Sequence, residues 1–272
     1  MTRWAAWEER RNVNMYKYVE DKQFLSRMRS LCGEIMQDLC HTLKEEYDIG
    51  ASFYLVGSGA RNLILQNANQ PIDLDYNLEI TRTDDWEDCK EIKECVRKAF
   101  NIVLREYGWS DCQDSTSSLT MKEQHFNQGN STEFSMDICI VCEDTDGNYH
   151  RLIHDKRCFP NRYFWNQAPN SRRLKEKADY IKSKGKWALV REQYKRIMDL
   201  MQDYRERIER GDKCGRGGFE QAMYEIVPDH RGDYHMCEEL VKGFRDENRW
   251  EEVFDNLYGE MSKYSYLKLK DE

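Results

Sequence analysis

The chain has 272 residues, a formal net charge of −8, and 39% hydrophobic and 34% charged residues. This balance is typical of a highly charged globular protein and not of a disordered one, and the length allows two modest domains. No apolar run approaches the roughly 20 residues of a membrane-spanning helix. Residues 1–13 carry acidic side chains where a signal peptide would be apolar. We therefore expect a cytoplasmic protein without a membrane partner.

The ten cysteines are scattered through segments with helical or strand-like patterns, which favours reduced thiols over a disulfide framework. Cys139 and Cys142 have the CxxC spacing of zinc and redox sites. They lie in a segment that is predicted to be a strand, where residues i and i+3 point to opposite faces. Core packing is therefore the better interpretation of this pair.

The first part of the chain predicts a long helix followed by a strand. Apolar residues recur at helical spacing over residues 20–47, and residues 53–56 form a short β-prone run. Gly57, Ser58 and Gly59 end this strand, and residues 61–66 can form a short helix before the loop NANQP.

Residues 72–80 alternate between apolar and polar side chains, which predicts a strand with two different faces. Asp73 and Asp75 share its polar face. Asp84 or Asp85 is predicted to cap the next helix, which should end at Gly108.

Three more strands are predicted at residues 118–125, 133–142 and 149–153, with Asp146 and Gly147 as the turn between the last two. Helical patterns then recur over residues 187–208 and 250–261. The expected fold class is α+β, with a mixed sheet and flanking helices followed by an all-helical lobe. We expect a first domain over residues 1–160, with the sheet and an N-terminal helix, and a helical second domain over 161–272.

Residues 151–216 hold 19 Lys or Arg against 9 Asp or Glu, although the whole chain is acidic. This basic segment can be a solvated helical face or a surface that meets phosphates. The acidic whole argues against duplex DNA as a partner, because duplex binding requires many phosphate contacts. Small anionic ligands and a single RNA strand remain open.

The two aspartates at i and i+2 would resist ionising together unless a cation neutralises them. Asp137 projects from the polar face of its own predicted strand and adds a third carboxylate. Oxygen ligands without a nearby His or Cys favour Mg²⁺ or Mn²⁺ over zinc. Gly57 permits close backbone approach to a phosphate, and Ser58 offers an amide and a hydroxyl.

This pattern resembles the signature of the DNA polymerase beta-like nucleotidyltransferase superfamily, in which an apolar residue and Gly-Ser precede an Asp-x-Asp pair and a distant strand aspartate. The layout is similar to that of template-independent members: the 2′-5′ oligoadenylate synthases, the bacterial cyclic-oligonucleotide synthases and the minimal nucleotidyltransferases. The gap of 14 residues from Gly59 to Ile72 is slightly longer than usual for the family.

The resemblance implies an enzyme that uses two magnesium ions and a nucleoside triphosphate, transfers the nucleotidyl group to an acceptor hydroxyl and releases pyrophosphate. Asp73 and Asp75 would hold both metals, Asp137 would help to activate the acceptor, and Gly57 and Ser58 would hold the triphosphate. The acceptor can be a nucleotide, an RNA or a small molecule.

Further candidates for triphosphate contact are Arg61, Lys182 and Lys184, although Arg61 can equally form a surface ion pair. The basic segment and the long gap also fit a non-catalytic nucleotide- or RNA-binding protein that has kept the fold. A third possibility is a regulatory or antitoxin-like protein that acts through its protein surface.

Overall fold

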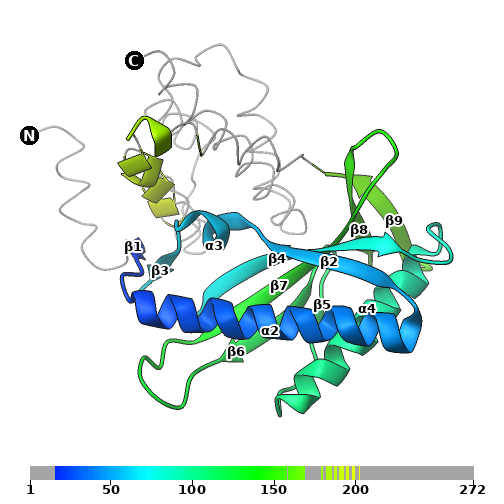
Figure 1. Ribbon diagram of the computed structural model, residues 1–272, viewed down its shortest axis with the longest axis horizontal. Coiled ribbons are helices and arrows are strands. Elements are labelled where there is room, and N and C mark those ends of the chain that lie inside the picture. Colours follow the sequence, from blue (N-terminus) through cyan, green and yellow to red (C-terminus); the bar gives the residue numbers. More distant parts are fainter. Residues whose placement is uncertain are drawn as a thin grey trace, which may run out of the picture. The chain divides into compact units, whose positions relative to one another are not determined.

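The computed structural model describes residues 16–157 and 159–168, together with scattered positions between 179 and 202. The chain divides into two compact units, Met1–Ala168 and Pro169–Glu272. The sheet and the long helices belong to the first unit (Figure 1). The helices predicted over residues 187–208 and 250–261 lie for the most part outside the described residues.

Two long helices form where the sequence predicts them. Helix α2 spans Lys22–Tyr47 and begins at Asp21, whose side chain accepts a hydrogen bond of 2.9 Å from the backbone N–H of Phe24. Helix α4 spans Cys89–Glu106 and begins at Asp88, not at Asp84 or Asp85 as predicted. Asp85 instead accepts the backbone N–H of Glu87 in a turn before the helix, because a short carboxylate can close such a turn as readily as it caps a helix.

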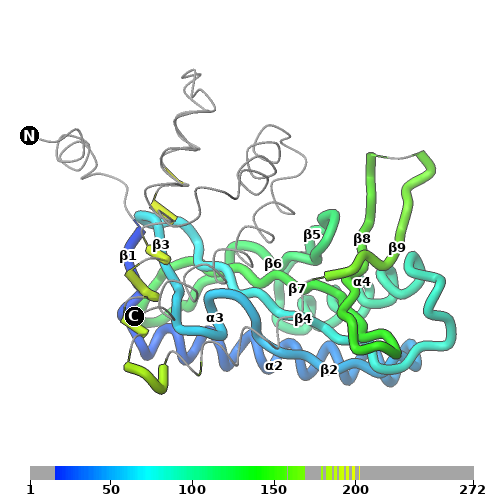
Figure 2. Tube along the Cα trace, turned by 90° about the horizontal axis from the view of Figure 1, so that it is seen from above, coloured from blue at the N-terminus to red at the C-terminus, as the bar shows by residue number. Residues whose placement is uncertain are grey.

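The main sheet is mixed, and strands β4 (Ile72–Arg82) and β7 (Phe134–Glu143) pair in parallel at its centre. The other ladders of this sheet are antiparallel. The remaining strands of the sheet are β2 (Gly50–Leu55), β5 (Gln113–Asp114), β6 (Leu119–Gln124), β8 (Tyr149–Asp155) and β9 (Arg162–Gln167). Figure 2 shows β8 and β9 projecting as a hairpin.

A second, two-stranded sheet joins β1 (Tyr16–Tyr18) to β3 (Leu65–Asn67). The prediction of a helix over residues 61–66 was therefore wrong. Helix α3 spans Gly57–Arg61 and ends at Asn62, which has a left-handed φ of 57°. The Gly-Ser-Gly segment, interpreted from sequence as the end of the strand, lies inside this helix.

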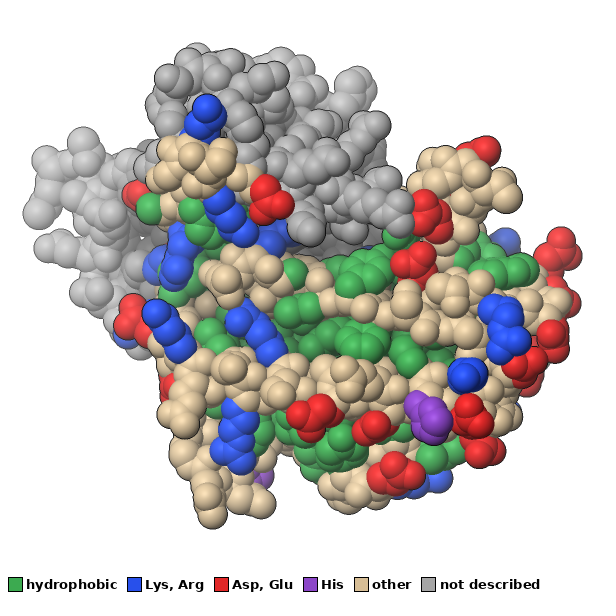
Figure 3. All heavy atoms as spheres, viewed as in Figure 1, with side chains coloured by type: hydrophobic (Ala, Val, Ile, Leu, Met, Phe, Trp, Pro, Cys, Tyr) green, Lys and Arg blue, Asp and Glu red, His purple; other side chains and the backbone are tan. Residues whose placement is uncertain are grey.

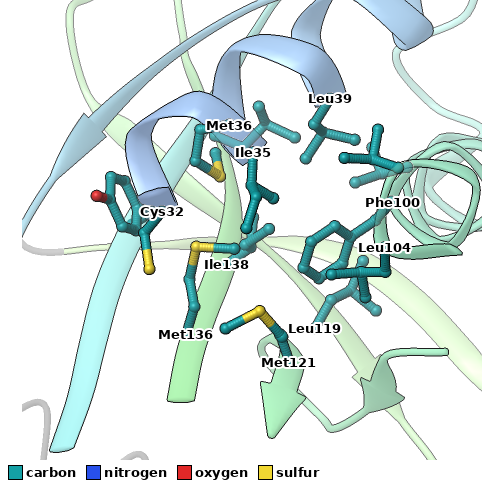
Figure 4. Close-up of a cluster of buried hydrophobic side chains, with 14 of the residues drawn as sticks. Cys32, Ile35, Met36, Leu39, Phe100, Leu104, Leu119, Met121, Met136 and Ile138 are labelled. Carbon is teal, nitrogen blue, oxygen red and sulfur yellow. The ribbon is translucent and has the colours of Figure 1, made fainter. Parts of the chain in front are cut away.

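Helices α2 and α4 cover one face of the main sheet, and the hydrophobic core lies between these helices and the sheet. Strand β4 buries alternate residues from Ile72 to Ile80 on this face, and α2 and α4 contribute apolar stripes. Figure 4 shows side chains of both helices pointing toward those of β6 and β7. Each fully buried aliphatic or aromatic side chain contributes about 1.5–3 kcal/mol. The opposite face of β4 carries polar residues, and β7 contributes Ser135, Asp137 and Glu143 there together with Cys139 and Val141.

The solvent side of α2 carries both acidic and basic side chains, which appear as red and blue patches along the helix in the space-filling view (Figure 3). Among the described residues, no helix is both long and apolar enough to cross a membrane.

Candidate functional site

The three predicted carboxylates lie on one face of the central parallel ladder. Asp73 and Asp75 project from alternate positions of β4, and Asp75 is directly paired with Asp137 on β7. Because paired residues of neighbouring strands point to the same side of a sheet, the two strands bring all three side chains to the face opposite the helices. Asp75 and Asp137 are half-buried and Asp73 is exposed.

The electrostatics of Asp73 reflect this crowding. The pKa of Asp73 is raised mainly because the surrounding chain removes water from its carboxylate, although part of the side chain is exposed. The nearby negative charge of Asp137 raises this pKa further. A hydrogen bond with Ser135 and the positive charge of Lys122 act in the opposite direction. A divalent cation would relieve this repulsion more fully than these groups do.

Two hydroxyl groups hold carboxylates of this cluster, and sequence reasoning missed both. Thr120 on β6 is paired with Asp137 and donates a hydrogen bond to its Oδ1 atom. Ser135, only 6% exposed, is paired with Asp73 and hydrogen-bonds to it. The alternation of each strand places these hydroxyls on the polar face, but only the register between strands reveals their partners.

Gly57 lies directly against the carboxylate of Asp75. Its φ is +61°, and a Cβ atom built there would approach Asp75 Oδ2 to 2.4 Å. The backbone N–H of Val56 donates a 2.8 Å hydrogen bond to the carbonyl of Asp75, which fixes the two segments together. Glycine is therefore required here both by backbone conformation and by space.

Gly59 allows α3 to lie close to the sheet, since an added Cβ would come within 2.8 Å of Leu74 Cδ2. Arg29 of α2 anchors the other end of α3: its guanidinium donates to the carbonyl of Gly59 at 2.9 Å and to Asn62 Oδ1 at 3.0 Å. The helix that carries Ser58 is thus held from both β4 and α2.

The predicted basic residues belong to different units of the chain. Arg61 is half-buried at the last position of α3. Lys182 and Lys184 are exposed and belong to the second unit, where the ammonium group of Lys182 lies 4.8 Å from the centre of the Trp187 ring. Lys122, which sequence reasoning did not select, is the cation that influences Asp73.

The donor set of the carboxylate face fits magnesium. In the part of the chain that the structure describes, no group of three or more His, Cys, Asp or Glu side chains is arranged to hold a metal by itself. Mg²⁺ is usually bound by one or two carboxylates, with water and substrate phosphates completing its shell. Asp73, Asp75 and Asp137 offer hard oxygen atoms of the kind that Mg²⁺ prefers.

The CxxC pair lacks the character of a redox site. Cys139 is half-buried and Cys142 is buried, and neither forms a disulfide bond. Burial raises the pKa of the Cys142 thiol to about 11, so this group is protonated at neutral pH and a poor nucleophile. This agrees with the interpretation of the pair as packing residues.

No protein-family model and no curated protein sequence matches the chain. Similar solved structures include the CD-NTase CdnG of Bradyrhizobium diazoefficiens in complex with GTP, with a TM-score of 0.37 and 16% identity over 55% of this chain and 40% of that one. The CdnE cyclic dinucleotide synthase of Elizabethkingia meningoseptica has a TM-score of 0.39 and 15% identity over 66% of this chain and 61% of that one. The DncV cyclic AMP-GMP synthase of Vibrio cholerae has a TM-score of 0.47 and 8% identity over 71% of this chain and 64% of that one.

The chain thus matches between 40% and 64% of the length of these three structures. With TM-scores below 0.5 and identities of 16% or less, they carry no conclusion about the substrate or activity of this chain.

Proposed function

We propose that the chain is a magnesium-dependent nucleotidyltransferase that moves a nucleoside monophosphate from a nucleoside triphosphate to an acceptor hydroxyl. The observation that carries the proposal is the register of β4 and β7, which places Asp75 opposite Asp137 and Asp73 two residues away on the same face. Three crowded carboxylates, one with a raised pKa, favour the binding of a divalent cation.

In the proposed reaction, the acceptor oxygen bonds to the α-phosphorus while the bond from that phosphorus to the bridging oxygen breaks, and pyrophosphate leaves. Asp137 takes the proton of the hydroxyl or passes it to water. Asp73, Asp75 and Asp137 would hold Mg²⁺, which would supply positive charge to the phosphate oxygens. Gly57 and Ser58 hold the triphosphate. Positioning and charge neutralisation account for the catalysis, as in other phosphoryl transfers.

We assign this chemistry to the first unit, Met1–Ala168, and the choice of acceptor to the second, Pro169–Glu272. The basic segment of residues 151–216 begins in the first unit and continues into the second. Lys182 and Lys184 are exposed there and are the candidates for contact with the polyphosphate or with the acceptor.

The test is to incubate the full chain with Mg²⁺ or Mn²⁺ and each labelled triphosphate, alone, in mixtures and with pools of hydroxyl acceptors, and to measure pyrophosphate release. Asp73→Asn should lower this release by about 100-fold or more, because it removes charge that stabilises the transition state through the metal. Glu79→Gln is the matched control, since Glu79 lies on the same face of β4, six residues further along, and should keep wild-type activity.

An Asp73→Asn protein with wild-type turnover would refute the assignment. Triphosphate binding that is indifferent to chelators and to Asp75→Asn, yet weakens steeply with salt and with changes at Lys182 or Lys184, would instead identify a non-catalytic binding protein.

A further inference from the structure

The two hydroxyls of the carboxylate face come from neighbouring strands and take one carboxylate each. Thr120 on β6 donates to Asp137 on β7, and Ser135 on β7 bonds to Asp73 on β4. Both pairs are direct register partners. Strand pairing itself therefore places each hydroxyl beside its carboxylate, and this placement does not depend on a loop conformation.

A distortion of β6 lies beside the second hydroxyl. The register of β6 against β7 shifts between Met121 and Gln124, and Glu123 adopts a left-handed φ of 56°. The backbone N–H of Glu123 lies 3.5 Å from Ser135 Oγ, at the long end of hydrogen-bond distances. Non-glycine residues at positive φ cluster at functional sites.

The effect on the carboxylates is geometric. A carboxylate on a strand rotates freely about its last torsion, and a hydrogen bond to one oxygen fixes that rotation. Thr120 bonds to Oδ1 of Asp137 and so restricts the rotation of this carboxylate. Groups that hold metal ligands in this way affect metal affinity by about 10- to 100-fold.

We propose that Thr120 and Ser135 are positioning residues that hold Asp137 and Asp73 in the arrangement that binds the divalent cation. The inference rests on the proposed function, because it assumes that these carboxylates are metal ligands.

The experiment titrates Mn²⁺ alone into the full chain and counts free Mn²⁺ by electron paramagnetic resonance. Thr120→Val removes the hydroxyl at nearly constant volume and should weaken Mn²⁺ binding by about 10-fold or more. Thr120→Ser keeps the hydroxyl and should restore wild-type affinity. Ser135→Ala should also weaken binding, and Thr81→Val, the same substitution at an exposed position of β4, should leave it unchanged.

Circular dichroism of each variant reports whether it is folded, and the rescue by Thr120→Ser separates a positioning role from a general loss of stability. Thr120→Val that lowers stability but binds Mn²⁺ like the wild type would overturn the inference and leave the proposed function intact. A wild-type chain that binds no Mn²⁺ without triphosphate would overturn this inference, and the proposed function would still be decided by pyrophosphate release in the presence of triphosphate and metal.

Discussion

Gly57 combines a left-handed backbone conformation with direct proximity to the Asp75 carboxylate. Gly57→Ala would add a Cβ atom 2.4 Å from Asp75 Oδ2 at a φ of +61°. The substitution should lower turnover by about 100-fold, because a displacement near 1 Å at a reacting centre has that effect. Pyrophosphate release measured at saturating triphosphate checks this prediction.

Gly129→Ala is the control that separates strain from collision. Gly129 also has a positive φ, of 86°, but a Cβ atom there would meet nothing within 4 Å. The control should lose about 1–2 kcal/mol of stability from the left-handed backbone alone and keep its activity. If both variants are equally active, the contact of Gly57 with Asp75 is irrelevant to catalysis.

The sequence alone indicates Asp73, Asp75 and Asp137, because alternation within a strand places i and i+2 on one face. It does not indicate Thr120, Ser135 or Lys122. Hydroxyls and lysines on a polar strand face are common, and what distinguishes these three is the strand register, which depends on contacts between distant segments.

At the scale of elements, a buried ion pair joins α4 to the sheet. Lys93 of α4 is only 2% exposed, and its ammonium group lies 2.7 Å from Oδ1 of Asp114 on β5. Lys156 and His154 approach the other carboxylate oxygen at 3.3 Å and 2.8 Å. Burial opposes the ionisation of Asp114, but the hydrogen bonds and charges of these neighbours outweigh it and lower the pKa.

Lys93→Met should lower the free energy of unfolding by about 2–3 kcal/mol, less than the roughly 3–5 kcal/mol expected for a buried pair, because Lys156 and the His154 ring still contact the Asp114 carboxylate. Urea denaturation measures the change. Lys98→Met is the matched control at an exposed position of the same helix and should stay within about 0.5 kcal/mol. Equal stability of the two variants would show that the ion pair contributes nothing.

The long elements α2, α4, β4 and β7 are predictable from the sequence because each has a sustained periodicity and a start or stop signal. The missed strands have physical reasons. β1, β3 and β5 contain only two or three residues, too few to show alternation. β9 contains six, but Arg162, Tyr163, Phe164 and Trp165 follow one another without a clear apolar face.

At the scale of the whole molecule, His154 makes stability depend on pH. Burial lowers its pKa below the ordinary 6.5, and Lys93 and Lys156 act in the same direction, while Asp114 opposes them. In the window below 6.5 the unfolded chain therefore binds more protons than the folded one, and stability falls as pH falls through this window. The centre of the His154 ring also lies 4.1 Å from the centre of the Tyr163 ring, and its Nε2 atom forms a hydrogen bond with Asn161.

His154→Gln should remove this part of the pH dependence. The loss of unfolding free energy between pH 7 and pH 5.5, measured by urea denaturation, should be smaller in His154→Gln than in the wild type. His41→Gln, at an exposed position of α2, should behave like the wild type. A His154→Gln protein with the wild-type pH dependence would contradict the prediction.

The parallel pairing of β4 with β7 also has a consequence for folding during synthesis of the protein. Asp75 and Asp137 are direct partners although 62 residues separate them in the chain, and pairings over such a separation close slowly. A nascent chain on the ribosome cannot assemble the three carboxylates before β7 has emerged and docked. The proposed nucleotidyl transfer would therefore require β7 to have docked, and an amino-terminal fragment that stops before residue 134 should lack it.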